Sequence, residues 1–119
     1  MSDCPFCVIA TDPTQGEILA SGLSVYALKP LGPVTEGHTL IIPIEHVTDF
    51  TDSPLVAADA MNFAAWYAKE NMPGPVNLIT SKGAEATQSV FHLHLHLVPR
   101  RKDDGLTLPW TGQKETRND

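Results

Sequence analysis

The sequence is short of positive charge and of long apolar runs, and each shortage excludes a class of protein. Its 119 residues include 8 lysines and arginines against 14 aspartates and glutamates, and the bases cluster only at Arg100-Arg101-Lys102. Because a long phosphate backbone requires clustered positive charge, we expect no nucleic acid polymer as a partner. No run approaches the roughly 18 apolar residues of a membrane helix, and the N-terminus lacks a basic and apolar signal region. We therefore expect a soluble, cytoplasmic protein with no membrane partner.

Cysteine is also scarce, since the chain contains only Cys4 and Cys7. Two cysteines three positions apart cannot staple a secreted scaffold of this size, so they favour metal or redox chemistry. With 42% hydrophobic residues, the chain can form one domain that buries roughly 65% of its unfolded surface. The sequence contains no internal repeat and no interior linker, and we place the domain at residues 1–110. Residues 111–119 are polar and lack apolar periodicity, so we expect a disordered tail.

What the chain does contain is an alternation of histidine and leucine within Ser89–Leu97. Three of the five histidines, His92, His94 and His96, lie in this segment. In a β-strand, alternate side chains share one face at a spacing of about 6.6 Å, so the pattern predicts a row of imidazoles opposite the leucines. A helix would scatter both sets around its circumference. We therefore expect a strand over Gln88–Val98.

Two chemistries suit a row of imidazoles, and one structural alternative competes with them. The alternative is a half-buried strand whose polar face happens to use histidine. Imidazole is a poor strand former, however, and three adjacent rings are costly to stack without a purpose. Neutral imidazoles are common metal ligands, and an imidazole can also act as a nucleophile in a phosphate-handling site. The motif itself leaves both chemistries open.

The rest of the sequence predicts the order β-hairpin, helix, β-hairpin. Ser53-Pro54 is typical of an N-cap followed by proline at the first helical position, and apolar residues then recur at helical spacing until Pro73-Gly74-Pro75. Besides the histidine strand, the expected elements are strands at Leu23–Leu28, Thr39–Ile42 and Val76–Thr80 and a helix at Pro54–Asn71. Between the last two strands, Ser81–Thr87 is expected to be a loop of small residues.

The segment His-Leu-His-Leu-His-Leu-Val that begins at His92 resembles the signature of the histidine triad (HIT) superfamily. Three further segments resemble the same family, namely Gly37–Pro43 with the following His46, Gln88–Phe91, and Cys4–Ile9. The last of these is similar to the zinc-carrying N-terminus of bacterial members. The resemblance covers roughly Cys4 to Trp110 and is closest to the Hint-like, nucleotide-binding branch.

This resemblance implies an α+β fold in which a five-stranded antiparallel sheet packs with two helices. It also implies a homodimer, in which the long helix and its neighbouring strand join two sheets into one. The fifth strand would lie at Glu17–Ala20 and the short first helix at Cys4–Ala10. Family members use a C-terminal segment that reaches toward the partner's site, which would give Trp110 a substrate-binding role. A tryptophan that closes the edge of the core is an equally good interpretation of Trp110.

The family mechanism implies a role for each residue of the motif. A nucleoside phosphoramidate carries a negatively charged phosphorus group that repels hydroxide, so a neutral imidazole is a suitable nucleophile. His94 would attack to give a nucleotidyl-histidine intermediate that water later hydrolyses, and His96 would hydrogen-bond the phosphate oxygens. Ser89 resembles the family serine that contacts phosphate or leaving group, although strict alternation places it on the Phe91 face unless a bulge re-aims it. Gln88 lies in register with the histidines and is expected to donate to the phosphate.

The N-terminal cysteine pair has two interpretations. Cys4 and Cys7 can supply two thiolates to a structural, tetrahedral zinc, and the resemblance implies His46 and His92 as the nitrogen ligands. The alternative is redox catalysis of the glutaredoxin type, which needs a strand before the first cysteine, and only three residues precede Cys4. We place His38 near the start of its strand and away from the site.

Three positions depart from the family pattern. The phosphate-contacting asparagine of the family aligns with Ser81, and the glycine that usually precedes the glutamine aligns with Thr87. A serine can still donate one hydrogen bond where an amide offers two sites, while a threonine adds a β-branch at a tight approach to phosphate. The acidic residue that commonly holds the ribose aligns with Lys29-Pro30, and neither residue has a side-chain acceptor.

These features favour a nucleotidyl hydrolase or transferase that cleaves nucleoside phosphoramidates or related adducts of a purine mononucleotide. A nucleotide-binding module with little turnover is the second possibility. A metal-binding protein that uses all three triad histidines as ligands is the third. The expected site thus comprises catalytic His94, His96 and Ser89, substrate-binding Gln88, Ser81, Thr87 and Trp110, and metal-binding Cys4, Cys7, His46 and His92.

Overall fold

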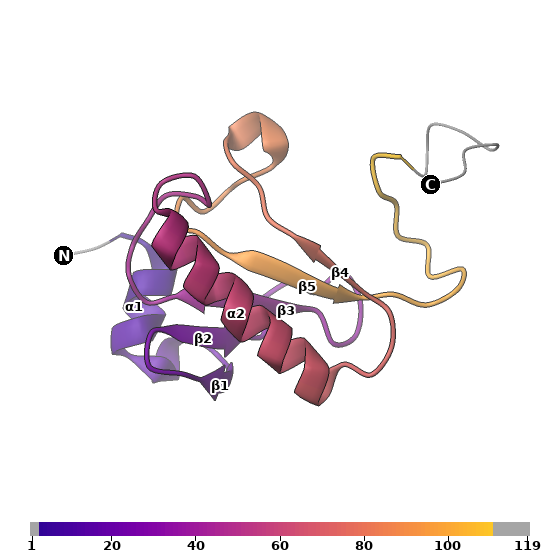
Figure 1. Cartoon of the computed structure of the whole chain (residues 1–119), viewed down its shortest axis with the longest axis horizontal. Coiled ribbons are helices and arrows are strands. Elements are labelled where there is room, and N and C mark those ends of the chain that lie inside the picture. The colour runs from indigo at the N-terminus through magenta and orange to yellow at the C-terminus, as the bar shows by residue number, and fades with distance from the viewer. Residues whose placement is uncertain (1–2, 111–119) are drawn as a thin grey trace.

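The computed structural model describes residues 3–110, which form an α+β fold (Figure 1). A five-stranded antiparallel sheet has the strand order β1-β2-β3-β5-β4. The strands are β1 (Ile18–Ser21), β2 (Val25–Leu28), β3 (Thr39–Pro43), β4 (Val76–Ile79) and β5 (Leu95–Pro99). The helices are α1 (Pro5–Thr11) and α2 (Pro54–Asn71), with short 3₁₀ helices at Pro13–Gln15 and Ala84–Ala86. The expected fold class is confirmed.

One helix covers each face of the sheet. The α2 helix, which crosses the sheet in Figure 1, packs with Ala27, Ile41 and the leucines of β5 in one core cluster. On the opposite face α1 packs against a second cluster that includes Tyr26 and Ile42. Because β2 and β3 are buried on both faces, nearly every position in them must be apolar. This burial explains why Thr39–Ile42 shows no polar alternation.

The long helix begins and ends where its terminal residues predict. The Ser53 hydroxyl accepts a hydrogen bond from the Val56 N–H at 3.3 Å, and Pro54 occupies the first turn, where no N–H is needed. The helix ends at Asn71 because Pro73-Gly74-Pro75 cannot continue it. The hairpin of β2 and β3 is also confirmed, with Val25 opposite Pro43 and Leu28 opposite Leu40.

The histidine strand is shorter than expected. It spans Leu95–Pro99 instead of Gln88–Val98, because β3 pairs with it only from Leu95 onward and β4 ends at Ile79. Before Leu95 the backbone leaves the ladder, and the Leu93 N–H donates instead to the Val47 carbonyl at 2.7 Å. The side chains still alternate, since Leu93, Leu95 and Leu97 all enter the cluster beneath α2.

Smaller differences concern the ends of elements. The first strand runs over Ile18–Ser21 and the first helix over Pro5–Thr11, each displaced one residue from the expectation. Within residues 3–110, no helix combines the length and the apolar character needed to cross a membrane. The expected tail at 111–119 lies outside the described residues.

Candidate functional site

The three triad histidines lie on the α1 side of the sheet. His92 is fully buried, whereas His94 and His96 are half-buried, and the His94 and His96 ring centroids are 5.1 Å apart. Phe6 of α1 makes edge contacts with the rings of His92 at 5.8 Å and His94 at 5.1 Å. The predicted row of imidazoles opposite the leucines is therefore present, with α1 packed against its first two rings.

Backbone carbonyls determine which nitrogen of His92 and of His94 carries the proton. A carbonyl can only accept, so His92 Nε2–H donates to the Pro43 carbonyl at 2.7 Å and His94 Nδ1–H donates to the His92 carbonyl at 2.8 Å. In a neutral ring the other nitrogen then carries a lone pair. His92 Nδ1 and His94 Nε2 are consequently free of protons and available as ligand or nucleophile.

His96 has the opposite arrangement, and His38 causes it. The Val34 N–H donates to His38 Nδ1 at 3.1 Å, so the proton of a neutral His38 resides on Nε2. His38 Nε2 lies 3.0 Å from His96 Nδ1 and donates to it. His96 therefore carries its own proton on Nε2. The triad thus places a bare nitrogen on His94 beside an N–H donor on His96.

The expectation that His38 lies away from the site is wrong. Leu40 is opposite His96 in the ladder between β3 and β5, so His38, two residues before Leu40, faces the same side of the sheet. The sequence signal was the Gly37-His38 start of a buried strand. Whether His38 faces the triad depends on the register of β3 against β5, which no local pattern reveals.

Burial keeps these rings neutral. It lowers the pKa of His94 and of His38 below the ordinary value for histidine. Burial, followed by the nearby His94 and His38 rings, lowers the pKa of His96 to about 4. At neutral pH the site therefore contains uncharged imidazoles, the form in which a ring nitrogen can act as a nucleophile.

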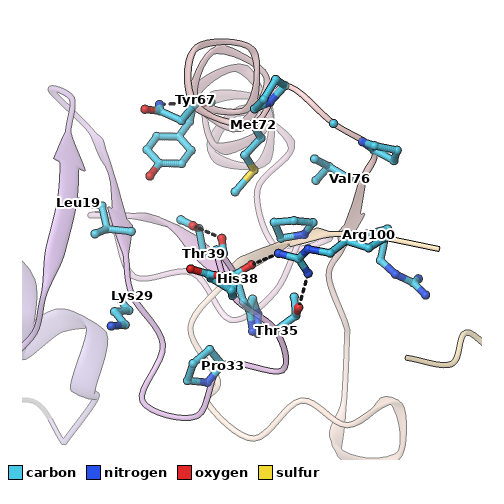
Figure 2. Close-up of a pocket in the computed structure, with 18 of the residues that line it drawn as sticks. Leu19, Lys29, Pro33, Thr35, His38, Thr39, Tyr67, Met72, Val76 and Arg100 are labelled. Atoms are coloured by element: carbon cyan, nitrogen blue, oxygen red, sulfur yellow. Dashed lines mark hydrogen bonds between the residues drawn. The ribbon is translucent and has the colours of Figure 1, made fainter. Parts of the chain in front are cut away.

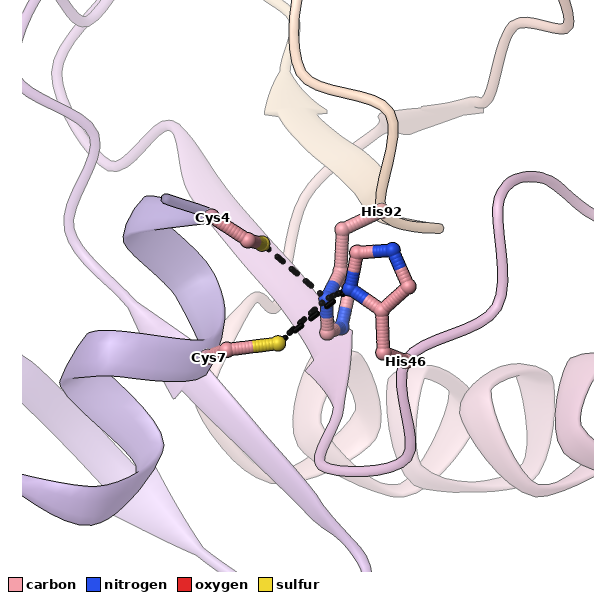
Figure 3. A group of neighbouring side chains, drawn as sticks. All are labelled: Cys4, Cys7, His46 and His92. Carbon is pink, nitrogen blue, oxygen red and sulfur yellow. Dashed lines mark hydrogen bonds between the residues drawn. The ribbon is translucent and has the colours of Figure 1, made fainter. Parts of the chain in front are cut away.

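A second cluster, Cys4, Cys7, His46 and His92, can hold a metal ion (Figure 3). One ligand atom from each residue lies within 4.8 Å of all the others. The two Nδ1 atoms are 3.1 Å apart, and Cys7 Sγ lies 3.2 Å from His46 Nδ1 and 3.5 Å from His92 Nδ1. His92 donates its other N–H to Pro43, as histidine ligands in metal sites ordinarily do with a backbone carbonyl. These four residues are the metal ligands expected from the sequence.

His92 belongs to both clusters. Its Nδ1 faces the thiols, while its backbone carbonyl accepts the His94 Nδ1–H. The Tyr26 hydroxyl donates to the Phe6 carbonyl at 2.7 Å, which ties the Cys4–Cys7 turn to β2. His92 thus joins the metal-binding cluster to the His94 ring, two positions further along the chain.

The loop before the triad places the other predicted residues differently. Gln88 is buried, its Oε1 accepts from the Gly83 N–H at 2.8 Å, and its Nε2 donates to the Thr48 and Val90 carbonyls. The expected direct donation from Gln88 to phosphate is therefore wrong, because the amide already holds the loop. Ser89 and Thr87 are exposed and Ser81 is half-buried. Since Ser89 precedes β5, strand alternation does not determine its direction.

Trp110 does not close the core. It is 44% exposed and belongs to neither core cluster of the described residues. Figure 1 shows the segment after β5 leaving the domain. The core-edge interpretation of Trp110 is therefore wrong.

The structure also contains a cavity of about 880 Å³ beneath the C-terminal end of α2 (Figure 2). Its lining includes Leu19, Lys29, Tyr67 and Met72, and it includes none of the triad histidines. Tyr67 belongs to the core cluster on the α2 face, whereas His38, which also lines the cavity, lies 3.0 Å from His96.

Comparison with known proteins agrees with this geometry, because residues 15–103 match the HIT domain family. The chain belongs to the HIT family. The adenosine 5′-monophosphoramidase of Saccharomyces cerevisiae is 34% identical to it over 113 residues, which cover 93% of this chain and 72% of the yeast protein. The HIT fold is shared with a HIT family hydrolase from Clostridium thermocellum, at a TM-score of 0.77 and 29% identity over 87% of this chain and 95% of that one. A histidine triad nucleotide-binding protein from Candida albicans gives a TM-score of 0.80 at 26% identity, covering 98% and 87% of the two chains.

Proposed function

We propose that this HIT protein is a nucleotidyl hydrolase that cleaves nucleoside phosphoramidates or related nucleotidyl adducts. The observation that carries the proposal is the matched pair of ring nitrogens, a bare Nε2 on His94 beside an Nε2–H on His96. The yeast phosphoramidase that resembles this chain supports the choice of substrate class. A purine mononucleotide is the proposed nucleotide part.

His94 is the proposed nucleophile. Its Nε2 forms a bond to phosphorus, and the bond between phosphorus and the amine breaks as the amine takes up a proton. Water then attacks the nucleotidyl-histidine, which releases the mononucleotide and the ring. His96 Nε2–H donates to the phosphate oxygens, and we propose that the hydroxyls of Ser89, Ser81 and Thr87 supply further donors.

The proposed metal is a structural zinc. In a tetrahedral site, zinc distances of about 2.05 Å to nitrogen and about 2.3 Å to sulfur separate two nitrogens by about 3.3 Å and a nitrogen from a sulfur by about 3.5 Å. The corresponding separations in the cluster are 3.1 Å for the two nitrogens and 3.2–3.5 Å for nitrogen and sulfur. Two thiolates and two imidazoles are also a donor set that zinc prefers.

A homodimer is the proposed assembly, formed through α2 and the edge strand β4. β4 is at the end of the sheet order and exposes Leu78 and Ile79. On α2, the exposed fraction is 80% for Leu55, 49% for Met61 and 51% for Trp66. In such a dimer Trp110 would reach the partner's site. Sedimentation that shows a monomer at micromolar concentration would contradict this assembly.

The two other functions differ from this one in measurable ways. A binding module would take up nucleotide without turnover. A triad metal site would use His94 and His96 as ligands, yet among the described residues the metal-binding cluster includes only His92 from the triad. Metal content of His92→Ala and His94→Ala protein separates this case, because only a triad metal is lost with His94.

The test is hydrolysis of an adenosine phosphoramidate that carries a fluorescent amine, together with mass spectrometry of acid-quenched protein. Wild type should release the amine and show an added nucleotidyl group on His94. His94→Ala should abolish both signals while metal content and thermal unfolding stay as in wild type, and His96→Ala should reduce turnover less completely. Wild-type kcat in His94→Ala would overturn the covalent mechanism. Binding without turnover by the wild type would establish the binding module.

A further inference from the structure

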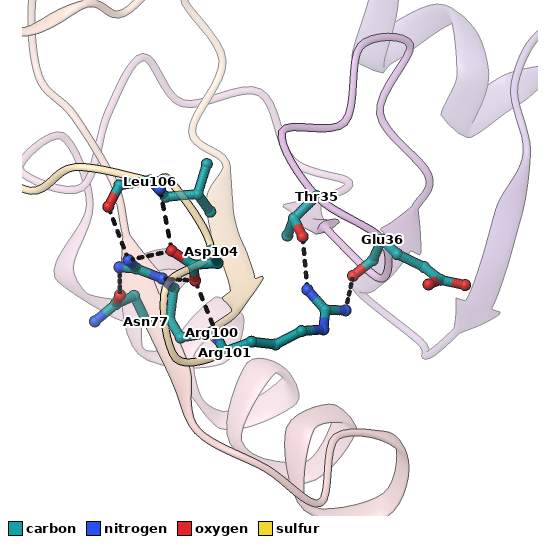
Figure 4. A network of polar contacts seen from close by, with 7 residues as sticks. All are labelled: Thr35, Glu36, Asn77, Arg100, Arg101, Asp104 and Leu106. Carbon is teal, nitrogen blue, oxygen red and sulfur yellow. Dashed lines mark hydrogen bonds and ion pairs between the residues drawn. The ribbon is translucent and has the colours of Figure 1, made fainter.

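A turn between β2 and β3 is held by a side chain from beyond β5 (Figure 4). Arg101 donates from Nη1 to Thr35 Oγ1 at 2.7 Å and from Nη2 to the Glu36 carbonyl at 3.2 Å. The turn itself is closed by the His38 N–H, which donates to the Thr35 carbonyl at 3.2 Å. Arg101 therefore holds Thr35 and Glu36, which come shortly before His38 in the chain.

The same turn packs closely against Pro99 at the end of β5. Gly37 has a φ of +90°, and a Cβ at this position would lie 3.1 Å from Pro99 Cγ. Glycine permits both the positive φ and the close approach. The turn thus lies against Pro99 and is tied by Arg101, so its position relative to β5 is defined from two directions.

The turn carries the hydrogen bonds that orient His96. Val34, just before the turn, donates to His38 Nδ1, and His38 Nε2–H donates to His96 Nδ1. We propose that Arg101 is a positioning residue for His96. By holding the turn, Arg101 maintains the hydrogen bonds from Val34 to His38 and from His38 to His96. These bonds orient the His96 ring so that its Nε2–H points toward the phosphate of the proposed substrate. The catalytic part of this role rests on the proposed function.

The two arginines after β5 have different tasks. Arg100 is engaged with the Asn77 amide oxygen at 2.7 Å, with the Asp104 carboxylate and with the Leu106 carbonyl. It binds the C-terminal segment to β4. Arg101 alone of the two reaches the turn, and its planar fork spans oxygens on two successive residues, which a lysine ammonium cannot do equally well.

The test compares Arg101→Ala and Arg101→Lys with Lys102→Ala, a change at the neighbouring exposed residue. In histidine-labelled, zinc-loaded protein, the hydrogen-bonded Nε2–H of His38 and the acceptor Nδ1 of His96 give proton and nitrogen resonances that report this contact. Arg101→Ala should lose the His38 ring N–H resonance and shift His96 Nδ1. Arg101→Lys should retain part of the signal, and Lys102→Ala should match wild type. Unchanged ring resonances in Arg101→Ala would overturn the proposal.

Kinetics supply the second readout. Arg101→Ala should lower kcat about three- to tenfold and change KM less than about twofold, because the oriented donor acts chiefly in the transition state. An unchanged kcat would count against the positioning role. If the wild type itself shows no turnover, the proposed function fails, whereas the ring resonances still decide whether Arg101 orients His96.

Discussion

Thr87 occupies a backbone conformation that its side chain disfavours, and this offers a sharp test of the loop before the triad. Its φ of 74° and ψ of 19° are left-handed, a region in which a Cβ crowds the following carbonyl. The strain for a residue other than glycine is roughly 1–2 kcal/mol, and a β-branch raises it. Glycine removes the strain but adds about 0.5–1 kcal/mol of unfolded-chain entropy. Thr87→Gly should therefore stabilise the protein by about 0.5–1 kcal/mol.

The assay is urea unfolding of zinc-saturated protein, supported by thermal melting. We expect a higher urea midpoint at unchanged m, and a melting temperature raised by roughly 2–5 °C. Thr87→Asn should give a smaller gain, because an asparagine tolerates this conformation without a β-branch. Ala86→Gly is the matched control, since Ala86 does not have a positive φ, and it should be destabilising. If Thr87→Gly loses stability as Ala86→Gly does, the strain argument is wrong.

Four further predictions follow from the same contacts. Because the pKa of His96 is lowered to about 4, the unfolded chain binds more protons than the folded one between about pH 6.5 and pH 4, so acid destabilises the fold. Allowing for solvent screening, the free energy of unfolding measured in urea should fall by about 1 kcal/mol more in the wild type than in His96→Gln between pH 7 and pH 5. Equal decreases in the two proteins would refute this. Tyr26→Phe removes the 2.7 Å bond to the Phe6 carbonyl and should cost about 1–2 kcal/mol in the same assay; unaltered stability would show that α1 is held by packing alone. Cys7→Ser should reduce bound zinc by elemental analysis and lower the melting temperature, and full zinc occupancy would contradict the assigned ligands. Because Lys29-Pro30 provides no ribose acceptor, kcat/KM for matched ribo and deoxyribo phosphoramidates should differ by less than roughly tenfold, and a larger ratio would mean that another residue holds the ribose.

Local patterns were sufficient for the regular elements. The Ser53-Pro54 start, the apolar repeat and the Pro73-Gly74-Pro75 stop predicted α2 to the residue. The hairpin of β2 and β3 followed from two apolar runs around a loop rich in proline and glycine. These features depend on neighbours a few residues apart, which the sequence displays directly.

Errors arose where a distant segment competes with a local pattern. The alternation before Leu95 reads as a strand, but the neighbouring strands offer no partners there and the Leu93 N–H bonds to Val47. Gln88 reads as a ligand to phosphate, but its amide is occupied by the carbonyl of Thr48, forty positions away. In both cases the deciding hydrogen bond joins segments whose proximity has no local signature.

The sequence by itself reduced the chemistry to a few kinds. Three histidines at alternate positions share one face, where they suit either metal binding or nucleophilic attack, and two cysteines three positions apart suit a metal. Tertiary structure decided which nitrogen of each ring is available. His92 and His94 are oriented by backbone carbonyls, whereas His96 is oriented by His38, 58 positions earlier in the chain. The proton of a neutral imidazole resides on whichever nitrogen faces an acceptor. Its position therefore depends on the register of β3 against β5 and on the turn beside Arg101, and only the folded chain brings these together.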